Sequence, residues 1–255
     1  MKTAIFALAL AGSSQANLLT MNDELVEINE RCEKDILKAT GMKWPQRKKR
    51  LESDECMEYL AMRAFSGSIG KTISQMNEYG CWCYFGDDHG RGKGAPQDAI
   101  DEMCKVLHDG YECAMRDAED EGTTCVPWEV AYTSAVGGSG LSIAEECAQV
   151  NPGSNCAARA CTVEGSFVAN LLDVFVSGGG IDQTMKHSNG FDQPTTCATK
   201  KNGGGPTNKQ CCGNYPDRFP FKTVGGDRKC CGTRTFNSLT LKCCDADSST
   251  VKFNC

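Results

Sequence analysis

The sequence has few histidines, no long apolar run and no nucleotide-binding motif. No stretch comes near the roughly 18 consecutive apolar residues that a membrane-spanning helix needs. The glycine-rich segments lack the Gly-Lys-Ser/Thr of a P-loop, which excludes that class of nucleotide site. A net charge of −6 and the lack of any recognition motif argue against a nucleic acid partner. With only three histidines in 255 residues, each is a candidate for chemistry.

Cysteine, by contrast, is abundant, because the chain has eighteen. It has no paired CxxC motifs of the kind that bind zinc, and thiols at this density persist as disulfides in an oxidising compartment. Residues 1–16 agree with that compartment: Lys2, a short apolar run over 4–11 and small residues up to Ala16 predict a cleaved signal peptide. The sequence therefore predicts a secreted, extracellular protein rich in disulfide bonds.

Residues 17–50 are polar and end in four basic residues, Arg47 to Arg50. In an exported chain this end is typical of a convertase processing site, which makes 17–50 a candidate propeptide; a solvated charge run is the alternative. Cleavage there would separate Cys32 from the other seventeen cysteines, unless a bond such as Cys32–Cys56 keeps the leader attached. The apolar spacing over 51–76 then predicts a helix that packs against the next stretch.

The stretch 79–113 combines a glycine-rich acidic loop with a helix. In the loop Cys83–Pro96, four glycines and the pair Asp87-Asp88 are typical of a site where oxygen atoms turn toward a hard cation such as calcium. Pro96 and Asp98 predict a helix start. Asp98 and nearby acidic residues place negative charge where the helix dipole favours it. The acidic residues of these first turns are Asp98, Asp101 and Glu102.

The predicted helix brings its candidate reactive groups to defined faces. Cys104, His108 and Tyr111 recur at helical spacing and share a face, while Asp109 lies about 100° around the axis. His108 can then face a substrate as a general base, and Asp109 can close a cation site in the loop. A purely structural histidine is the alternative, but the adjacent Asp109 and the glycine loop favour the base.

These residues resemble the secreted phospholipase A2 family. The shared features are YGCWC at 79–83, a glycine-rich loop that ends Gly94-Ala95-Pro96, and a helix with Cys104 before His108-Asp109. The family signature is YGCYC, a glycine loop and DxxDRCCxxHDxCY. The resemblance covers about 51–185. It implies two antiparallel disulfide-linked helices and a calcium loop.

The resemblance also implies a chemistry and a ligand set. His108 would activate a water that attacks the sn-2 ester of a phospholipid, at a membrane surface or a micelle. Calcium would polarise the ester carbonyl. Asp109 would bind the ion together with main-chain carbonyls of Trp82, Tyr84 and Gly86.

The family places a second carboxylate on a later antiparallel helix, where it orients the histidine. Glu164, at the start of the apolar helical stretch over 165–176, is the candidate here, and an ordinary acidic residue of a first helical turn is the alternative. On the same register the family's bond Cys83–Cys104 is retained. Two other disulfides of the family are absent here, and in each case both cysteines are replaced. Val163 and Tyr111 stand at the positions of one disulfide, and Met103 and Asn170 stand at those of the other.

Two departures from the family favour a second hypothesis. The loop Cys83–Pro96 is longer than the family's by an acidic, glycine-rich insertion, and one residue is added between Cys104 and His108. A shift of the base by about 1 Å can cost roughly a hundredfold in rate. The main prediction is a calcium-dependent phospholipase A2. The alternative is a catalytically weak protein of that fold, acting as a secreted calcium-binding or extracellular-matrix protein.

Between the two helices, 123–152 is expected to form a wing of loops. Trp128 and Tyr132 in this wing can face lipid, as amphipathic aromatic side chains do, or pack against the helices, which is the simpler interpretation. Five cysteines are available to staple the wing. They are Cys113, Cys125, Cys147, Cys156 and Cys161.

The C-terminal part differs in composition. The pairs Cys211-Cys212, Cys230-Cys231 and Cys243-Cys244 resemble the di-cysteine repeats of galaxin-type matrix proteins. Eight cysteines from Cys197 onward and ten before it allow each part to close its own bonds. From Cys197, ten Lys and Arg face four Asp, which suggests an anionic matrix or lipid partner, with a solvated surface as the alternative.

The predicted fold is mainly α and disulfide-rich, with a small cysteine-rich irregular or β module at the end. The predicted divisions are a signal peptide (1–16), a propeptide (17–50), a phospholipase A2-like domain (51–185) and a C-terminal module (186–255).

Overall fold

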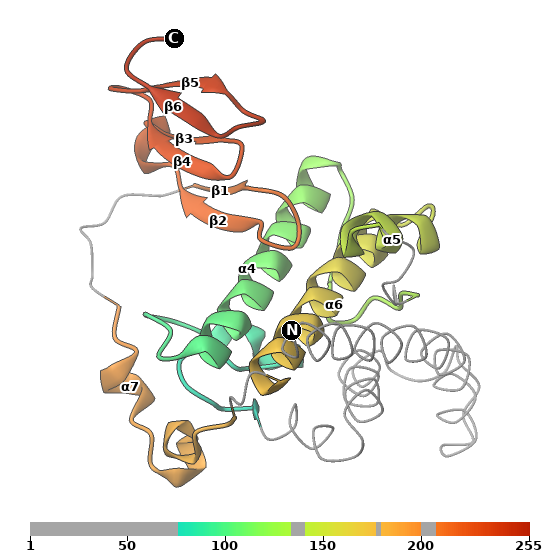
Figure 1. Cartoon of the computed structure of the whole chain (residues 1–255), viewed down its shortest axis with the longest axis vertical. Coiled ribbons are helices and arrows are strands. Elements are labelled where there is room, and N and C mark those ends of the chain that lie inside the picture. The colour runs from blue at the N-terminus through green and yellow to red at the C-terminus, as the bar shows by residue number, and fades with distance from the viewer. Residues whose placement is uncertain (1–75, 134–140, 177–179, 200–207) are drawn as a thin grey trace, which may run out of the picture.

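The computed structural model describes residues 76–133, 141–176, 180–199 and 208–255 (Figure 1). The predicted signal peptide, the propeptide with its basic end, Cys32, Cys56 and the predicted helix up to residue 75 lie outside the described residues. Within them the chain is disulfide-rich, with helices followed by a small module of antiparallel strand pairs. No helix in the described ranges is long and apolar enough to cross a membrane.

Helix α4 (Ala99–Asp120) begins where the sequence predicts. Asp98 is its N-cap, and its carboxylate accepts the N–H of Asp101 at 2.8 Å. This satisfies one of the N–H groups that the first turn leaves without a helical partner. The buried stripe of the helix includes Cys104, Leu107, His108 and Tyr111, so the face predicted to carry the chemistry is turned inward.

Helix α6 (Asn155–Val176) packs antiparallel on α4. Contacts run from Glu121 with Arg159 to Tyr111 with Glu164, so rising numbers on one helix meet falling numbers on the other. A side chain at Gly110 would place its Cβ 2.8 Å from the Val163 methyl groups, which shows how closely the helices approach. The close approach lets α6 cover the apolar face of α4. The expected disulfide link between the two helices is not found among the described residues, because the cysteines of α4 bond Cys83 and Cys211 and those of α6 bond the wing.

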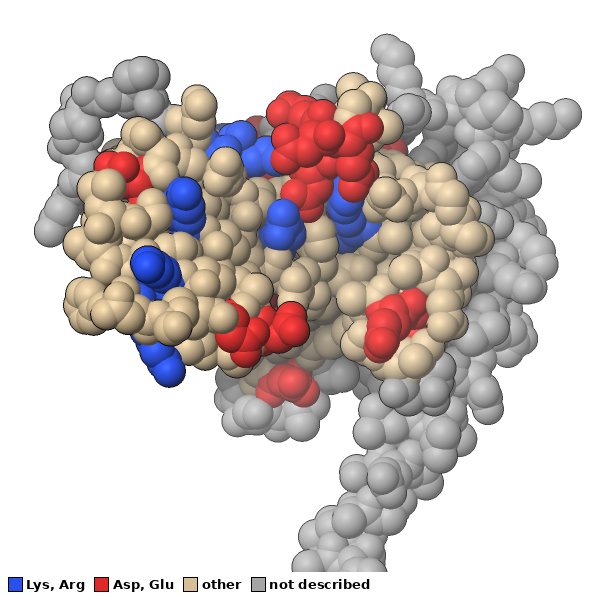
Figure 2. All heavy atoms as spheres, turned by 90° about the horizontal axis from the view of Figure 1, so that it is seen from above, with Lys and Arg blue, Asp and Glu red and all other residues tan. Residues whose placement is uncertain are grey.

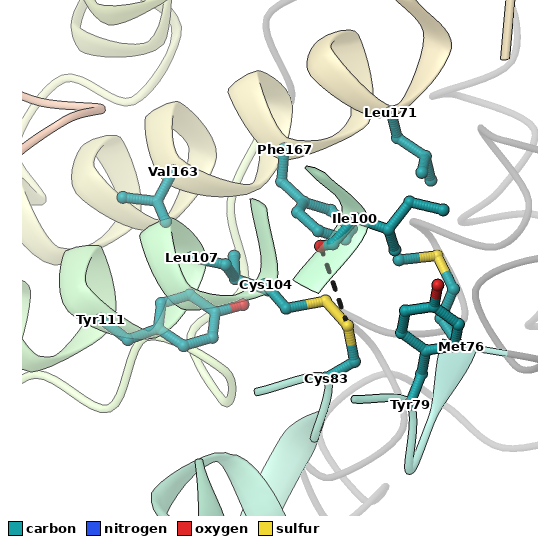
Figure 3. Packing of buried hydrophobic residues seen from close by; sticks show 10 residues of the cluster. All are labelled: Met76, Tyr79, Cys83, Ile100, Cys104, Leu107, Tyr111, Val163, Phe167 and Leu171. Atoms are coloured by element: carbon teal, nitrogen blue, oxygen red, sulfur yellow. Dashed lines mark hydrogen bonds between the residues drawn. A yellow bond between two sulfur atoms is a disulfide. The ribbon is translucent and has the colours of Figure 1, made fainter. Parts of the chain in front are cut away.

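The hydrophobic core lies between these helices (Figure 3). Val163, Phe167 and Leu171 of α6 extend toward α4, and the disulfide Cys83–Cys104 closes the side toward the loop. Val163 and Tyr111 both belong to this core, so apolar packing occupies the positions where the phospholipase A2 family has a bridge. The buried members are Met76, Tyr79, Cys83, Ile100, Cys104, Leu107, Tyr111, Val163, Phe167 and Leu171.

The wing between the helices contains α5 (Ile143–Val150), which begins with a capping box between Ser142 and Glu145. The disulfides Cys125–Cys156 and Cys147–Cys161 fasten it to α6, which confirms four of the five cysteines expected there. The fifth, Cys113, bonds Cys211 instead. Trp128 packs on the core beside the Tyr111 ring, and the Tyr132 hydroxyl bonds Glu164. Packing, rather than a lipid-facing surface, therefore accounts for both aromatic residues.

The segment between α6 and the C-terminal strands lies against the start of the loop. It contains short helical turns η3 (Gln183–Met185), η4 (His187–Asn189) and α7 (Gln193–Thr196). His187 Nε2 lies 2.8 Å from the Gly80 carbonyl oxygen, and the disulfide Cys81–Cys197 fixes the end of the segment.

Residues 208–255, here called the C-terminal module, form three two-stranded antiparallel hairpins. Their strands are β1 (Lys209–Cys212) with β2 (Phe219–Lys222), β3 (Arg228–Cys231) with β4 (Arg234–Asn237), and β5 (Lys242–Asp245) with β6 (Thr250–Lys252). A short turn, η5 (Val224–Gly226), separates the first two hairpins. Figure 1 shows them stacked in order away from α4.

The first two cysteine pairs each join their hairpin to the unit before it and to the hairpin after it, and the third pair bonds the second hairpin and Cys255. Within the module the bonds are Cys212–Cys230, Cys231–Cys243 and Cys244–Cys255. The first cysteine of the first pair, Cys211, bonds Cys113 of α4. The repeated cysteine pairs thus mark successive hairpins that are joined by disulfides. Each hairpin alone is too small to bury a hydrophobic core.

All sixteen cysteines of the described residues are in disulfides. The two parts of the chain do not close their bonds separately, although their cysteine counts would allow it. Cys81–Cys197 and Cys113–Cys211 join the two parts. An even number of cysteines in each part allows each part to form all its disulfides internally but does not require it. Two disulfides between the parts use two cysteines from each, so the number left in each part is still even.

The C-terminal module is also held to α4 by charge. Lys209 Nζ lies 2.7 Å from Glu112 Oε1, and Arg218 forms two bonds of 2.9 Å with the Asp117 carboxylate. Tyr215 donates its hydroxyl to the same carboxylate. On the face drawn in Figure 2, acidic side chains form a dense group with basic side chains beside it. Part of the basic excess therefore has a partner within the chain.

Candidate active site

The buried carboxylate of Asp101 anchors the glycine-rich loop to the start of α4. It accepts N–H bonds from Cys81 (2.9 and 3.0 Å), Trp82 (2.7 Å) and Gln97 (2.9 Å). Its neighbour Asp98 accepts the hydroxyl of Tyr79. One turn of helix thereby fixes the residues on both sides of the loop, and the Cys83–Cys104 disulfide fixes its first residue.

The role of Asp101 was missed by sequence reasoning, which treated it as one of several charges that suit a helix N-terminus. Burial raises the pKa of Asp101, and the N–H bonds from Cys81, Gln97 and Trp82 act in the opposite direction. The signal that could have identified it is the pair Asp98 and Asp101, one cap and one residue turned inward at the first turn.

His108 meets the loop through its imidazole ring. Its Nε2 lies 2.8 Å from the main-chain carbonyl oxygen of Tyr84, and the Trp82 ring packs edge-on at 5.8 Å between centroids. A carbonyl can only accept a hydrogen bond, so in the neutral ring the proton belongs on Nε2 and Nδ1 is the proton acceptor. His108 is 6 % exposed, so this tautomer is held in a largely dry environment.

Gly92 gives the loop its close approach to this histidine. A Cβ added there would lie 2.5 Å from a ring carbon of Trp82 and 3.2 Å from His108 Nδ1. Two of the predicted site residues, His108 and Trp82, are thus packed around a main-chain segment that has no room for a side chain.

Glu164 lies on the face of α6 that covers α4 and is fully buried. Its Oε1 accepts the Tyr111 hydroxyl at 2.6 Å, and its Oε2 accepts the Tyr132 hydroxyl. Two phenolic donors satisfy a buried carboxylate that would otherwise be costly. The structure therefore brings Glu164 to Tyr111, one turn along α4 from His108. The prediction that Glu164 stands in a first helical turn is wrong, because α6 begins at Asn155 and Glu164 lies buried in its interior.

Asp109 is largely buried and faces a cation of its own helix. Its Oδ2 lies 2.7 Å from the ammonium of Lys105, and this ammonium lies 5.8 Å from the centroid of the Trp82 ring. Burial raises the pKa of Asp109, and the Lys105 ammonium opposes that rise. The carboxylate predicted to bind calcium is thus paired with Lys105 and stands on the Trp82 side of the loop.

The oxygen atoms around this loop suit a hard cation. Across the described ranges no three His, Cys, Asp or Glu side chains converge where a metal could bind. A calcium site here would therefore combine Asp109 with main-chain carbonyls. Trp82 O accepts the N–H of Tyr84 at 2.8 Å and Tyr84 O accepts from His108, but each carbonyl oxygen has a second lone pair. Carboxylate and carbonyl oxygens are the donor types that calcium prefers, and the Asp109 carboxylate is paired with Lys105 in this structure.

The first half of the loop contains a 3-10 turn, η2 (Gly86–Arg91). Gly86, the third predicted carbonyl donor, is the first residue of this turn. The Arg91 guanidinium lies 4.7 Å above the Tyr84 ring and so ties the turn back to the loop.

No protein-family model matches the chain, and no curated protein sequence matches it. The resemblance to secreted phospholipases A2 thus rests on the motif residues alone.

Proposed function

We propose that the protein is a secreted, calcium-dependent phospholipase A2, a carboxylic ester hydrolase that converts phospholipids to lysophospholipid and free fatty acid. The observation that carries this proposal is the hydrogen bond between His108 Nε2 and the Tyr84 carbonyl oxygen, 2.8 Å long. It fixes the tautomer in which Nδ1 accepts a proton, on a ring held by a disulfide-fastened loop. A general base needs both properties.

In the proposed reaction His108 moves a single proton. Nδ1 takes a proton from a water as the water oxygen bonds to the carbonyl carbon of the sn-2 ester. Collapse of the tetrahedral intermediate breaks the ester bond, and the lysophospholipid alkoxide receives the proton back from Nδ1. Such base catalysis typically contributes about 10²–10⁴ in rate.

Calcium would supply electrophilic assistance. Asp109 and the carbonyls of Trp82, Tyr84 and Gly86 would hold the ion, which would polarise the ester carbonyl and stabilise the oxyanion. Glu164, held by Tyr111 and Tyr132, would support the packing of α6 against the helix that carries His108. The eight disulfides of the described residues suit a protein that works outside the cell, on a membrane surface or a micelle.

The test compares two histidine variants in fatty-acid release from phospholipid vesicles. We expect His108→Gln to lose at least about a hundredfold in rate, because the base is removed. His187→Gln is the matched control, since His187 contacts Gly80 on the other side of the loop and glutamine keeps a donor for that carbonyl. Equal rates for the protein and for His108→Gln would refute the assignment of the base.

A second candidate function is a calcium-binding or extracellular-matrix protein of the same fold with weak catalysis. The observation that favours weak catalysis is the ion pair between Lys105 and Asp109, because Lys105 competes with calcium for the expected carboxylate and so opposes the electrophilic assistance that hydrolysis needs. Calcium binding without hydrolysis by a folded protein would support this second function over the first.

A further inference from the structure

The three hairpins of the C-terminal module present basic residues at one edge. In each hairpin the first strand begins and the second strand ends at the open end, opposite the turn. The open ends of the three hairpins together form one edge of the module. The terminal cross-strand pairs at this edge are Lys209 with Lys222, Arg228 with Asn237, and Lys242 with Lys252. Five of these six residues are basic, and all six are exposed. We call this edge the open edge.

The open ends of the three hairpins lie on the same side of the module because their turns are bonded to one another on the other side. Gly213 donates its N–H to Gly232 O at 3.1 Å, and Thr233 donates its N–H to Ser249 Oγ at 2.8 Å. Three of the module's four acidic residues stand in or beside the turns, and the fourth, Asp227, precedes Arg228. The three are Asp217, Asp245 and Asp247.

Two large apolar side chains stand beside the last basic pair. Leu239 precedes β5 and Phe253 follows β6, so the pairing of Lys242 with Lys252 places both at the open end of the third hairpin. Each is 73 % exposed, the highest fraction among the large hydrophobic residues of the described part of the chain. Apolar exposure and basic charge therefore coincide at one place.

Both apolar residues stand on ordered backbone. The N–H of Leu239 bonds Asn237 Oδ1 at 2.9 Å, and that of Leu241 bonds Asn237 O at 2.9 Å. Phe253 lies between β6 and Cys255, which the bond to Cys244 holds against β5. Their exposure belongs to a fixed surface and not to a loose chain end.

We propose that the open edge at the third hairpin, made of Leu239, Lys242, Lys252 and Phe253, docks on an anionic phospholipid bilayer. The lysines attract the negative headgroups, and the two apolar side chains enter the boundary of the acyl region. Neither lysine has an ion-pair partner among the described residues, whereas Lys209 at the first hairpin is paired with Glu112.

The apolar residues decide between classes of anionic partner. A sulfated polysaccharide or a mineral surface would use the lysines but offers no apolar phase for Leu239 and Phe253. A bilayer uses both. The third hairpin is also the one farthest from α4 in Figure 1, where it can reach a surface without interference from the helices.

The test is flotation of the purified protein with vesicles, of phosphatidylcholine alone or mixed with phosphatidylserine, in the presence of a chelator. Because the chelator withholds calcium, binding is measured apart from hydrolysis, and it can succeed whether or not the protein is a phospholipase. We expect binding to the mixed vesicles that weakens as salt is added.

Two double variants separate the contributions. Lys242→Gln with Lys252→Gln should lower the partition coefficient roughly twentyfold, and Leu239→Ser with Phe253→Ser at least about tenfold. Arg234→Gln, at the turn end of the second hairpin, and Val150→Ser, at the end of α5, are the matched controls and should bind as the unaltered protein does. Near-ultraviolet circular dichroism confirms that each variant is folded.

Three results would overturn the proposal. One is equal vesicle binding by all variants. Another is binding to dextran sulfate with none to mixed vesicles. The last is a dimer in sedimentation that the Leu239→Ser, Phe253→Ser variant abolishes, because the apolar pair would then be an interface between copies of the chain.

Discussion

At the scale of single residues, the ion pair between Lys105 and Asp109 determines how the proposed calcium site behaves. The two side chains are one helical turn apart, 2.7 Å between Nζ and Oδ2, and partly buried. An ion that binds Asp109 must displace the ammonium, which then loses its partner. Lys105 is thus an internal competitor of calcium, and its removal changes affinity without altering any oxygen ligand.

Replacement of Lys105 by methionine should therefore tighten calcium and terbium binding by roughly fivefold, since such a pair contributes on the order of 1 kcal/mol. Terbium luminescence, sensitised by Trp82 beside the site, measures this directly. Asp109→Asn should abolish the signal. Lys93→Met removes the same charge from an exposed position of the loop and is the matched control. Unchanged or weaker binding by Lys105→Met would show that the lysine does not compete.

At the scale of elements, the loop and α4 behave as one unit. Asp101 binds three N–H groups of the loop and its flank, the Cys83–Cys104 disulfide crosses between them, and Gly92 fits against Trp82 and His108. Catalysis through His108 therefore depends on the path of the loop backbone as much as on the ring itself.

Gly92→Ala tests this dependence. The new Cβ would meet Trp82 at 2.5 Å, so either the ring or the loop must move, and His108 with it. We expect hydrolysis to fall by about a hundredfold while the protein loses only about 1–3 kcal/mol of stability. Gly90→Ala is the control, because nothing lies within 4 Å of a Cβ at that position. Comparable losses for both variants would contradict the packing argument.

Much of this unit could be predicted from the sequence. Asp98 shows the helix start, helical spacing puts Cys104, His108 and Tyr111 on one face, and the family register gives Cys83–Cys104. The pairing of Lys105 with Asp109 could not be predicted, and the inward turn of Asp101 has only its spacing from the cap Asp98 as a signal. Both depend on which rotamer and which neighbour a charged side chain takes once its helix is packed, and pattern alone does not encode that choice.

The C-terminal module shows the same division. Its di-cysteine repeat is visible in the sequence. The bonding order, in which each pair links backward and forward, follows from the stacking of hairpins and from the position of Cys113 on α4. Cysteine parity carries no information about spatial neighbours, so the two bonds between the parts were not foreseen.

At the scale of the whole molecule, the module rests on the acidic face of α4. Burial raises the pKa of Glu112, but its bonds with Lys209 and Arg116 outweigh this, and the net pKa lies below the ordinary value of 4.5. When folding lowers the pKa of a carboxyl group, the ionised carboxylate stabilises the folded state. This stabilisation is fully present at pH values above the pKa of the group in the unfolded state, and it is lost as the pH falls through its pKa in the folded state. The contact therefore weakens in acid.

We expect Glu112→Gln to cost less than about 1 kcal/mol near neutral pH, because the pair is partly exposed and screened by solvent. The difference from the unaltered protein should hold down to about pH 4.5 and shrink below it. Urea unfolding across this range measures it. Glu102→Gln, on the same helix and more exposed, is the control. A difference that grows in acid would have the wrong sign for this contact.

The most direct measurement for the whole account is the position of the bond that the protein cleaves. Vesicles carry phospholipid labelled in either the sn-1 or the sn-2 acyl chain, and release is followed with calcium and with a chelator. A calcium-dependent phospholipase A2 should release the sn-2 chain alone, and it should do so with calcium and not with chelator. The proposed activity would be contradicted if a folded protein that binds calcium released neither chain. It would also be contradicted if release were equal with calcium and with chelator.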